Sequence, residues 1–130
     1  MKIDISLLQK AIASLDEVLK LEKNAIIRDS AIQRFEYVFE FTIKFMRRYI
    51  EQNYSNMSDY DTNNFRDVIR TALQLKITEK SFEDWIKYRD ARNKTSHGYS
   101  EKEAEEVYFV AKEFLPEAKL IYKFLEKNIS

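Results

Sequence analysis

Apolar residues recur every three or four positions along most of the chain, which is the pattern of amphipathic helices. The first such segment spans residues 4–23, with Leu8, Ile12 and Leu15 in its apolar row. The second, residues 29–52, is the most apolar and has two apolar rows out of three. We therefore expect this second helix either to form the centre of a bundle or to face another subunit as well.

Three further helices are expected in the second half of the chain. The polar stretch 53–64 is rich in turn formers and is predicted to be a loop. Helices are predicted at about 62–75 and 81–95, and a fifth begins at Ser100. Ser100 and Glu103 have the spacing of a capping box, which favours a helix start at this point.

The composition supports a helical domain with short connections. A length of 130 residues suits one core, and 45% hydrophobic content is enough to fill it. One glycine and one proline in the whole chain argue against a β-rich or loop-rich fold, because tight turns need those residues. The prediction is an all-α, antiparallel, up-and-down bundle of about five helices, forming a single domain over residues 1–130.

Charge and cysteine content narrow the function. The 22 basic and 22 acidic side chains cancel, so any contact with nucleic acid must be local or shared with another subunit. The absence of cysteine excludes disulfides and thiolate metal sites, and it fits a reducing cytosol. The N-terminal twenty residues are interrupted by charges, so they predict neither a signal peptide nor a membrane span. We expect a cytoplasmic protein without membrane contact.

The only histidine and the only glycine lie together in the segment DARNKTSHGYSEKE, residues 90–103. Gly98 can take the positive φ that ends one helix, and Ser100 can cap the next, so both are explained by an ordinary connection. Arg92, His97 and Tyr99 are not explained in this way. On spacing alone, an ordinary turn with an exposed histidine remains the more frequent explanation for such a trio.

The chemistry available to this trio is nevertheless specific. A histidine can move a proton to or from a hydroxyl near neutral pH, and an arginine offers a planar fork to a phosphate. Together they suit metal-free RNA cleavage by the ribose 2′-OH, which yields a 2′,3′-cyclic phosphate and a 5′-OH. Efficient cleavage uses both a base and an acid, and this chain has one histidine. A symmetric homodimer would supply two, and the wide apolar face of the second helix favours a dimer on separate grounds.

Other residues are candidates for lining or supporting a cleft. They adjoin the trio or form the polar row of the second helix, which is otherwise a solvated face: Asn93, Tyr88, Asp29, Gln33, Glu36, with Glu40 continuing the row. Arg34 lies on an apolar row and is expected to need a carboxylate if it is buried. No metal site is expected, because His97 has no histidine or cysteine partner in its own chain. No cofactor is predicted.

These residues resemble HEPN domains (higher eukaryotes and prokaryotes nucleotide-binding). The stretch RNKTSHGY matches the Arg-x4-His-x-Tyr motif of HEPN domains. RDSAIQRFEYVFEFTIKF and ARNKTSHGYSEKEAEEVY are similar to two blocks of one subfamily, the HepT-like proteins, often described as substrate-binding subunits of a minimal nucleotidyltransferase. The resemblance covers about residues 5–128. It implies an antiparallel helical bundle that dimerises with the two motifs facing one another.

The resemblance also implies a function. Many HEPN proteins with this motif are ribonuclease toxins in which the arginine and histidine, here Arg92 and His97, carry cleavage. The antitoxin would be a separate minimal nucleotidyltransferase that silences the toxin by AMP transfer to the motif's tyrosine, here Tyr99. Two other hypotheses stay open: a non-catalytic substrate- or nucleotide-binding subunit of such an enzyme, and a plain helical interaction module. The chain is not itself the nucleotidyltransferase, because its only glycine, Gly98, cannot form the glycine–serine loop of those enzymes.

Overall fold

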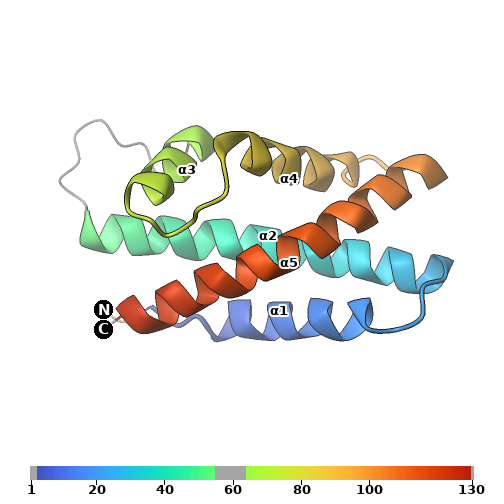
Figure 1. The fold of residues 1–130 in the computed structure, drawn as a ribbon, viewed down its shortest axis with the longest axis horizontal. Helices are drawn as coiled ribbons and strands as arrows, with labels where there is room; N and C mark the ends of the chain where they lie inside the picture. Colours follow the sequence, from blue (N-terminus) through green and yellow to red (C-terminus); the bar gives the residue numbers. More distant parts are fainter. Residues whose placement is uncertain (1–2, 55–63, 130) are drawn as a thin grey trace.

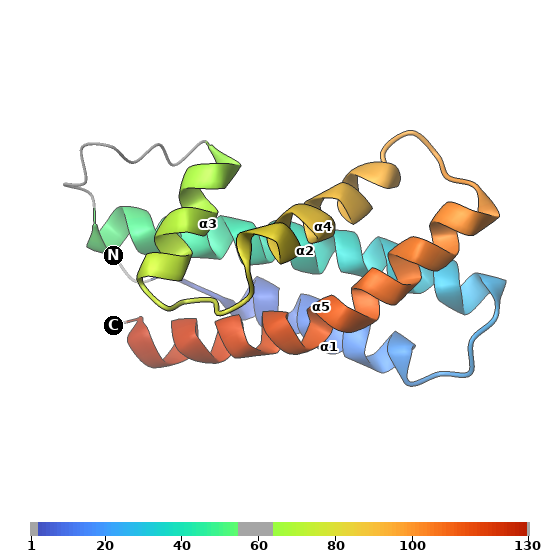
Figure 2. The same ribbon diagram turned by 45° about the horizontal axis from the view of Figure 1, so that its top comes forward.

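The computed structural model describes residues 3–54 and 64–129, which form five α-helices and no β-strand (Figure 1). The helices are α1 (Ser6–Leu19), α2 (Ala25–Asn53), α3 (Phe65–Gln74), α4 (Phe82–Lys94) and α5 (Glu101–Asn128). The predicted all-α class is therefore confirmed. Helices α1, α4 and α5 pack along the long α2, and α3 covers the end of α2 where that helix finishes (Figures 1 and 2). Within the described residues, no helix is long and apolar enough to cross a membrane.

Helix α2 is the centre of the bundle. The members of its two apolar rows, among them Phe35, Val38, Phe45 and Met46, are buried at 1% exposure or less. The neighbours that bury them belong to the same chain, chiefly α1 and α5. The wide apolar face of α2 is therefore explained within one subunit, and it no longer favours a dimer. The homodimer stays a prediction that rests on the single histidine.

Local caps set helix ends that differ from the sequence-based bounds. Helix α2 begins four residues earlier than predicted, because the side chain of Asn24 accepts a hydrogen bond of 2.8 Å from the backbone N–H of Ile27. This earlier start brings Arg28 into the helix. The side chain of Asn64 caps the start of α3 by accepting a hydrogen bond from the backbone N–H of Arg66. Most of the predicted loop 53–64 lies outside the described residues.

An aromatic cluster joins α4 to the core. The ring of Tyr88 lies 4.8 Å from that of Phe114 in α5 and 5.3 Å from that of Trp85, centroid to centroid. Tyr88 is only 3% exposed, and burial, followed by the charge of Asp84, raises its pKa to about 12. Of the two roles predicted for Tyr88, lining or supporting a cleft, its burial is compatible only with the supporting one. It shares the inward face of α4 with Trp85 and Ala91, each three residues away.

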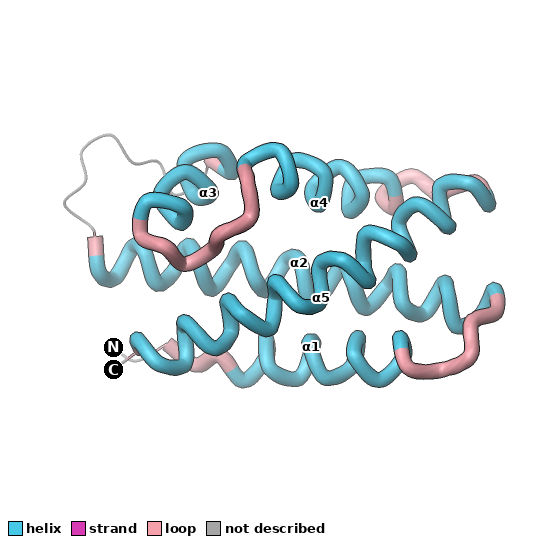
Figure 3. Tube along the Cα trace, in the orientation of Figure 1, coloured by secondary structure: helices cyan, strands magenta, loops and turns pink. Residues whose placement is uncertain are grey.

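A buried polar link holds the α3–α4 connection against α5. The hydroxyl of Thr78 donates to the carboxylate of Glu117 and accepts a 3.1 Å hydrogen bond from Nε1 of Trp85. Glu117 and Thr78 are each 3% exposed, and burial raises the pKa of Glu117. Figure 3 draws this connection as a loop that runs from the end of α3 to the start of α4. These hydrogen bonds fix the loop to α4 and α5.

Candidate functional site

The connection between α4 and α5 carries the motif, and local hydrogen bonds shape both of its ends. Where α4 ends, the hydroxyl of Thr95 donates to the carbonyl oxygen of Arg92 at 2.7 Å. Gly98 has a φ of +83°, which is the left-handed conformation predicted for it. The side chain of Ser100 accepts from the N–H of Glu103, and Glu103 accepts in return, both at 3.1 Å. The predicted capping box is therefore confirmed.

The guanidinium of Arg92 is held in place by two other side chains. Its Nε donates to Oε1 of Glu40 in α2 at 3.0 Å, and its Nη2 donates to the same oxygen. Its Nη1 donates to the hydroxyl of Ser96 at 3.0 Å. These contacts occupy three of the five N–H groups of a guanidinium and leave two for a ligand. Arg92 is thus an oriented cation, with 24% of its side chain exposed.

His97 lies in the turn just beyond α4, where the sequence predicts it. Its side chain is exposed and makes no hydrogen bond or ion pair with the residues that the structure describes. Asn93, beside Arg92, is also exposed. An exposed imidazole five residues from an oriented guanidinium can take a proton from a hydroxyl of a bound molecule.

Tyr99 lies in an acidic environment at the start of α5. Its side chain is 37% exposed. Partial burial raises the pKa of Tyr99, and the charges of Asp29, Glu36 and Glu101 raise it further, while Arg28 opposes them. Asp29 and Glu36, two of the predicted cleft residues, therefore lie close to the tyrosine. Gln33, on the same row of α2, is exposed.

Sequence reasoning missed Arg28, which is only 5% exposed. It donates to Glu101 at 2.7 and 3.3 Å, to Glu105 at 3.3 Å and to Asp29 at 3.1 Å. The hydrogen bonds with Glu101 are the main cause of a raised pKa of Arg28, and Arg28 lowers the pKa of Glu101. The cluster ties the start of α2 to the first turns of α5. The signal in the sequence was a pair of glutamates four apart at the start of the fifth helix.

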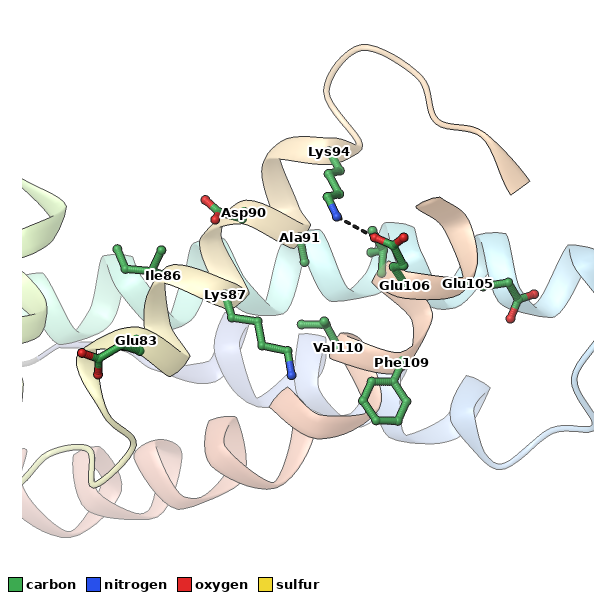
Figure 4. Close-up of a pocket in the computed structure, with 11 residues that line it drawn as sticks. Glu83, Ile86, Lys87, Asp90, Ala91, Lys94, Glu105, Glu106, Phe109 and Val110 are labelled. Atoms are coloured by element: carbon green, nitrogen blue, oxygen red, sulfur yellow. Dashed lines mark hydrogen bonds and ion pairs between the residues drawn. The ribbon is translucent and has the colours of Figure 1, made fainter. Parts of the chain in front are cut away.

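A separate groove lies between α4 and α5. It has a volume of about 690 Å³ and is lined in part by Ile86, Val110 and the exposed ring of Phe109. An ion pair of 2.7 Å between Lys94 and Glu106 crosses it (Figure 4). Arg92, His97 and Tyr99 are not among its lining residues, so the groove is not part of the motif site. Over the described residues, no group of three or more histidine, cysteine or acidic side chains is placed to hold a metal ion.

Comparison with known proteins identifies the family of this chain. A family model described as "Nucleotidyltransferase substrate binding protein like" matches residues 3–127. This chain belongs to that family. A protein named "Probable ribonuclease HepT" from Haemophilus influenzae is 32% identical, over 98% of this chain and 94% of that protein. The HepT-like assignment made from the motif and its flanking blocks is therefore confirmed.

Two solved structures share the fold. HI0074 from Haemophilus influenzae, described as the fold of a substrate binding domain of a nucleotidyltransferase, aligns with a TM-score of 0.81 and 29% identity. The alignment covers 95% of this chain and 99% of that one. The protein ttk003001694 from Thermus thermophilus aligns with a TM-score of 0.74 and 27% identity, over 91% and 98% of the two chains. This chain therefore shares its helical fold with both solved proteins.

Proposed function

We propose that this chain is the ribonuclease toxin of a toxin–antitoxin pair whose other member is a minimal nucleotidyltransferase. The observation that carries the proposal is the oriented guanidinium of Arg92 together with the exposed imidazole of His97, five residues later in the turn after α4. The 32% identity to a protein named as a probable ribonuclease supports it. The substrate would be RNA, because the chemistry that these two groups can perform uses a ribose 2′-OH.

In the proposed reaction, the neutral imidazole of His97 removes the proton of the 2′-OH. The 2′ oxygen attacks the adjacent phosphorus, and the bond from phosphorus to the 5′ oxygen breaks. The two free N–H groups of Arg92 stabilise the charge that develops on the phosphoryl oxygens. The leaving 5′ oxygen takes a proton, which gives a 2′,3′-cyclic phosphate and a 5′-OH. No metal ion takes part in these steps.

The leaving oxygen needs a proton donor, and the chain has one histidine. We place the second His97 of a two-fold homodimer in that role, with the two motifs facing a shared cleft. The prediction then requires that a monomeric form be inactive. Light scattering combined with an activity assay over a dilution series tests this requirement.

Silencing would occur at Tyr99. The partner nucleotidyltransferase would transfer AMP to the phenolic oxygen of Tyr99, two residues beyond His97. The adduct brings a phosphodiester into a region that already holds Asp29, Glu36 and Glu101. Added negative charge and bulk beside the imidazole would exclude the RNA backbone.

The deciding experiment compares the wild type with His97→Ala in an RNA cleavage assay that contains EDTA. We expect wild-type activity to survive the chelator. We expect the variant to lose roughly 10²–10⁴-fold, the usual contribution of a general base. Lys127→Ala, prepared in the same way, is the control for purification and folding, because Lys127 is exposed near the far end of α5. Equal cleavage by His97→Ala, or loss of activity in EDTA, contradicts the ribonuclease proposal.

The second candidate is a non-catalytic subunit that binds substrate or nucleotide for a minimal nucleotidyltransferase. The family description and the description of HI0074 both favour it. Under this hypothesis the wild type and His97→Ala are equally inert toward RNA, and both bind the partner enzyme. Co-purification with the partner, combined with the cleavage assay, separates the two candidates.

A further inference from the structure

The charge of the polar row of α2 changes from negative to positive along the helix. Its first half carries the acidic residues near the motif, and its second half carries three cations. We call these three the α2 basic strip, which consists of Lys44, Arg47 and Arg48. None of the three forms an ion pair with any residue that the structure describes. Several other surface lysines are paired with carboxylates: Lys20, Lys23, Lys87, Lys94 and Lys119.

The contact between Glu40 and Arg92 places this strip relative to the motif. Helices α2 and α4 lie side by side and run in opposite directions (Figures 1 and 2). Lys44 lies one turn after Glu40 in α2, and Arg47 lies two turns after Glu40. At a rise of 1.5 Å per residue, they stand about 6 Å and about 10 Å farther along α2. The strip therefore leads away from Arg92 toward the end of α2 that α3 covers.

Lys44 and Arg47 are half-buried and Arg48 is exposed, and each has a part of its side chain near the protein. Nζ of Lys44 and Cζ of Arg48 are 5.7 and 5.8 Å from the centroid of the Phe45 ring. Nε of Arg47 is buried and has no hydrogen-bond partner among the described residues. A guanidinium held in this way without a carboxylate keeps its charge uncompensated. Three such cations in a row attract an extended anion rather than a single small one.

We propose that the α2 basic strip binds the phosphates of RNA on one side of the bond that is cleaved. This inference rests on the proposed ribonuclease function. A stacked strand advances about 3.4 Å per nucleotide, so the distance from Glu40 to Arg47 corresponds to roughly three nucleotides. The acidic first half of α2 repels a backbone, so the strand extends from Arg92 in one direction only. A short strip also explains how a chain of zero net charge handles RNA.

Salt-dependent binding tests the strip. A short single-stranded RNA oligonucleotide is titrated with His97→Ala protein, which prevents turnover, at several salt concentrations. The triple variant Lys44→Gln, Arg47→Gln, Arg48→Gln in this background keeps most of each aliphatic stem and removes three charges. We expect weaker binding, and a slope of log K against log salt that is shallower by about 0.7 for each phosphate that the variant no longer neutralises.

The matched control removes the same charge elsewhere. It combines Lys10→Gln, Lys123→Gln and Lys127→Gln, which are exposed residues of α1 and α5. The control should keep the slope of the His97→Ala parent. Arg47→Lys with Arg48→Lys should keep most of the affinity, because backbone attraction needs charge rather than a fork; this variant also detects a folding defect caused by losing either arginine.

The possible results separate the strip from the proposed function. If the wild type cleaves RNA but the strip variant keeps the parent's slope, the strip proposal is wrong and the ribonuclease proposal stands. If the wild type never cleaves RNA but the strip variant loses RNA binding, the strip is an RNA-binding surface, and both the ribonuclease proposal and the placement of the strip beside a cleaved bond are wrong. If the strip variant loses only its binding to the nucleotidyltransferase, the strip is a protein-docking surface and the RNA assignment is wrong.

Discussion

A single carboxylate oxygen of Glu40 in α2 accepts two hydrogen bonds from the guanidinium of Arg92 in α4. The contact joins the two helices through residues that are 52 positions apart in the chain. Ser96 takes one further N–H, so two N–H groups of the guanidinium have no partner among the residues that the structure describes. Glu40 therefore holds the cation in one orientation without consuming all of its donors.

Substitutions of Glu40 should distinguish its role in orienting Arg92 from the effect of its negative charge. Glu40→Gln keeps a carbonyl oxygen that can accept both hydrogen bonds, so kcat should stay within a few-fold of the wild type. Its lost negative charge should tighten RNA binding and lower KM. Glu40→Ala frees the guanidinium, and kcat should fall about 10- to 100-fold, as expected when a catalytic group loses its position. Steady-state kinetics on one RNA measure both effects. If Glu40→Ala cleaves faster than the wild type, Glu40 restrains Arg92 instead of orienting it.

Arg92→Lys should resemble Arg92→Ala more than the wild type. A lysine keeps the positive charge, but it cannot contact Glu40, Ser96 and a phosphate through one rigid plane. We expect a loss of roughly 10²-fold in kcat, comparable to the removal of one donor that stabilises developing charge. The measurement is single-turnover cleavage at saturating protein. Activity of Arg92→Lys close to that of the wild type would mean that Arg92 contributes charge alone.

Tyr99→Phe should separate cleavage from silencing. The variant keeps the aromatic ring and removes the oxygen that would accept AMP, so RNA cleavage should change less than a few-fold. Incubation with the partner enzyme and ATP should add AMP to the wild type and not to the variant, as measured by intact-protein mass spectrometry. In cells, the variant should stay toxic when the partner is expressed. Because the pKa of Tyr99 is raised, its hydroxyl is protonated at neutral pH and the partner must remove that proton. An AMP adduct on Tyr99→Phe would place the modification on another residue.

The sequence predicted the features that depend on near neighbours in the chain. The apolar rows of α2, the left-handed Gly98 and the capping box of Ser100 and Glu103 are each determined within one helix or one turn. Each was predicted correctly because helical periodicity and cap chemistry act over three or four residues.

The contacts between helices were not predictable in the same way. Arg34 was expected to need a carboxylate only if it is buried; it is half-buried, and it donates to the backbone carbonyl of Ser14 in α1 at 2.8 Å. The glutamates that join Arg28 and Arg92 to other helices lie 52 to 77 positions away, so these contacts depend on how the helices pack. Periodicity identifies which face of a helix is polar. It does not identify which other helix that face meets.

The Arg28 cluster predicts a loss of order at the motif. Arg28→Met keeps a long apolar stem and removes the hydrogen bonds to Glu101 and Glu105. Amide hydrogen exchange over residues 99–105 should become faster, and kcat should fall, with only a small decrease in Tm, because the carboxylates are exposed and screened by solvent. Lys87→Met is the matched control, since it removes an exposed 2.7 Å ion pair with Glu113 that lies away from the motif.

The Arg28 cluster also makes the stability of the fold depend on pH. Arg28 lowers the pKa of Glu101, so the pair stabilises the fold above the ordinary carboxyl pKa of 4.5 and loses this effect as the pH falls through the lowered value. Arg28→Met should therefore unfold with a shallower acid limb than the wild type. An unchanged exchange rate over residues 99–105 would mean that the cluster does not order the motif.

Glu117 should show the opposite dependence on pH. Its pKa is raised by burial, so the folded chain holds a proton at pH values where the unfolded chain has lost one. The wild type must then lose stability relative to Glu117→Gln as the pH rises above the ordinary value of 4.5, and the difference becomes constant above the raised pKa. The glutamine still accepts the hydrogen bond from Thr78. Glu117→Ala leaves that hydroxyl without its acceptor and should cost about 1–3 kcal/mol. Denaturant unfolding of all three proteins at several pH values between the acid range and pH 8 measures these differences. If Glu117→Gln is as unstable as Glu117→Ala at pH 8, the link to Thr78 requires the ionised carboxylate, and the sign argued for Glu117 is wrong.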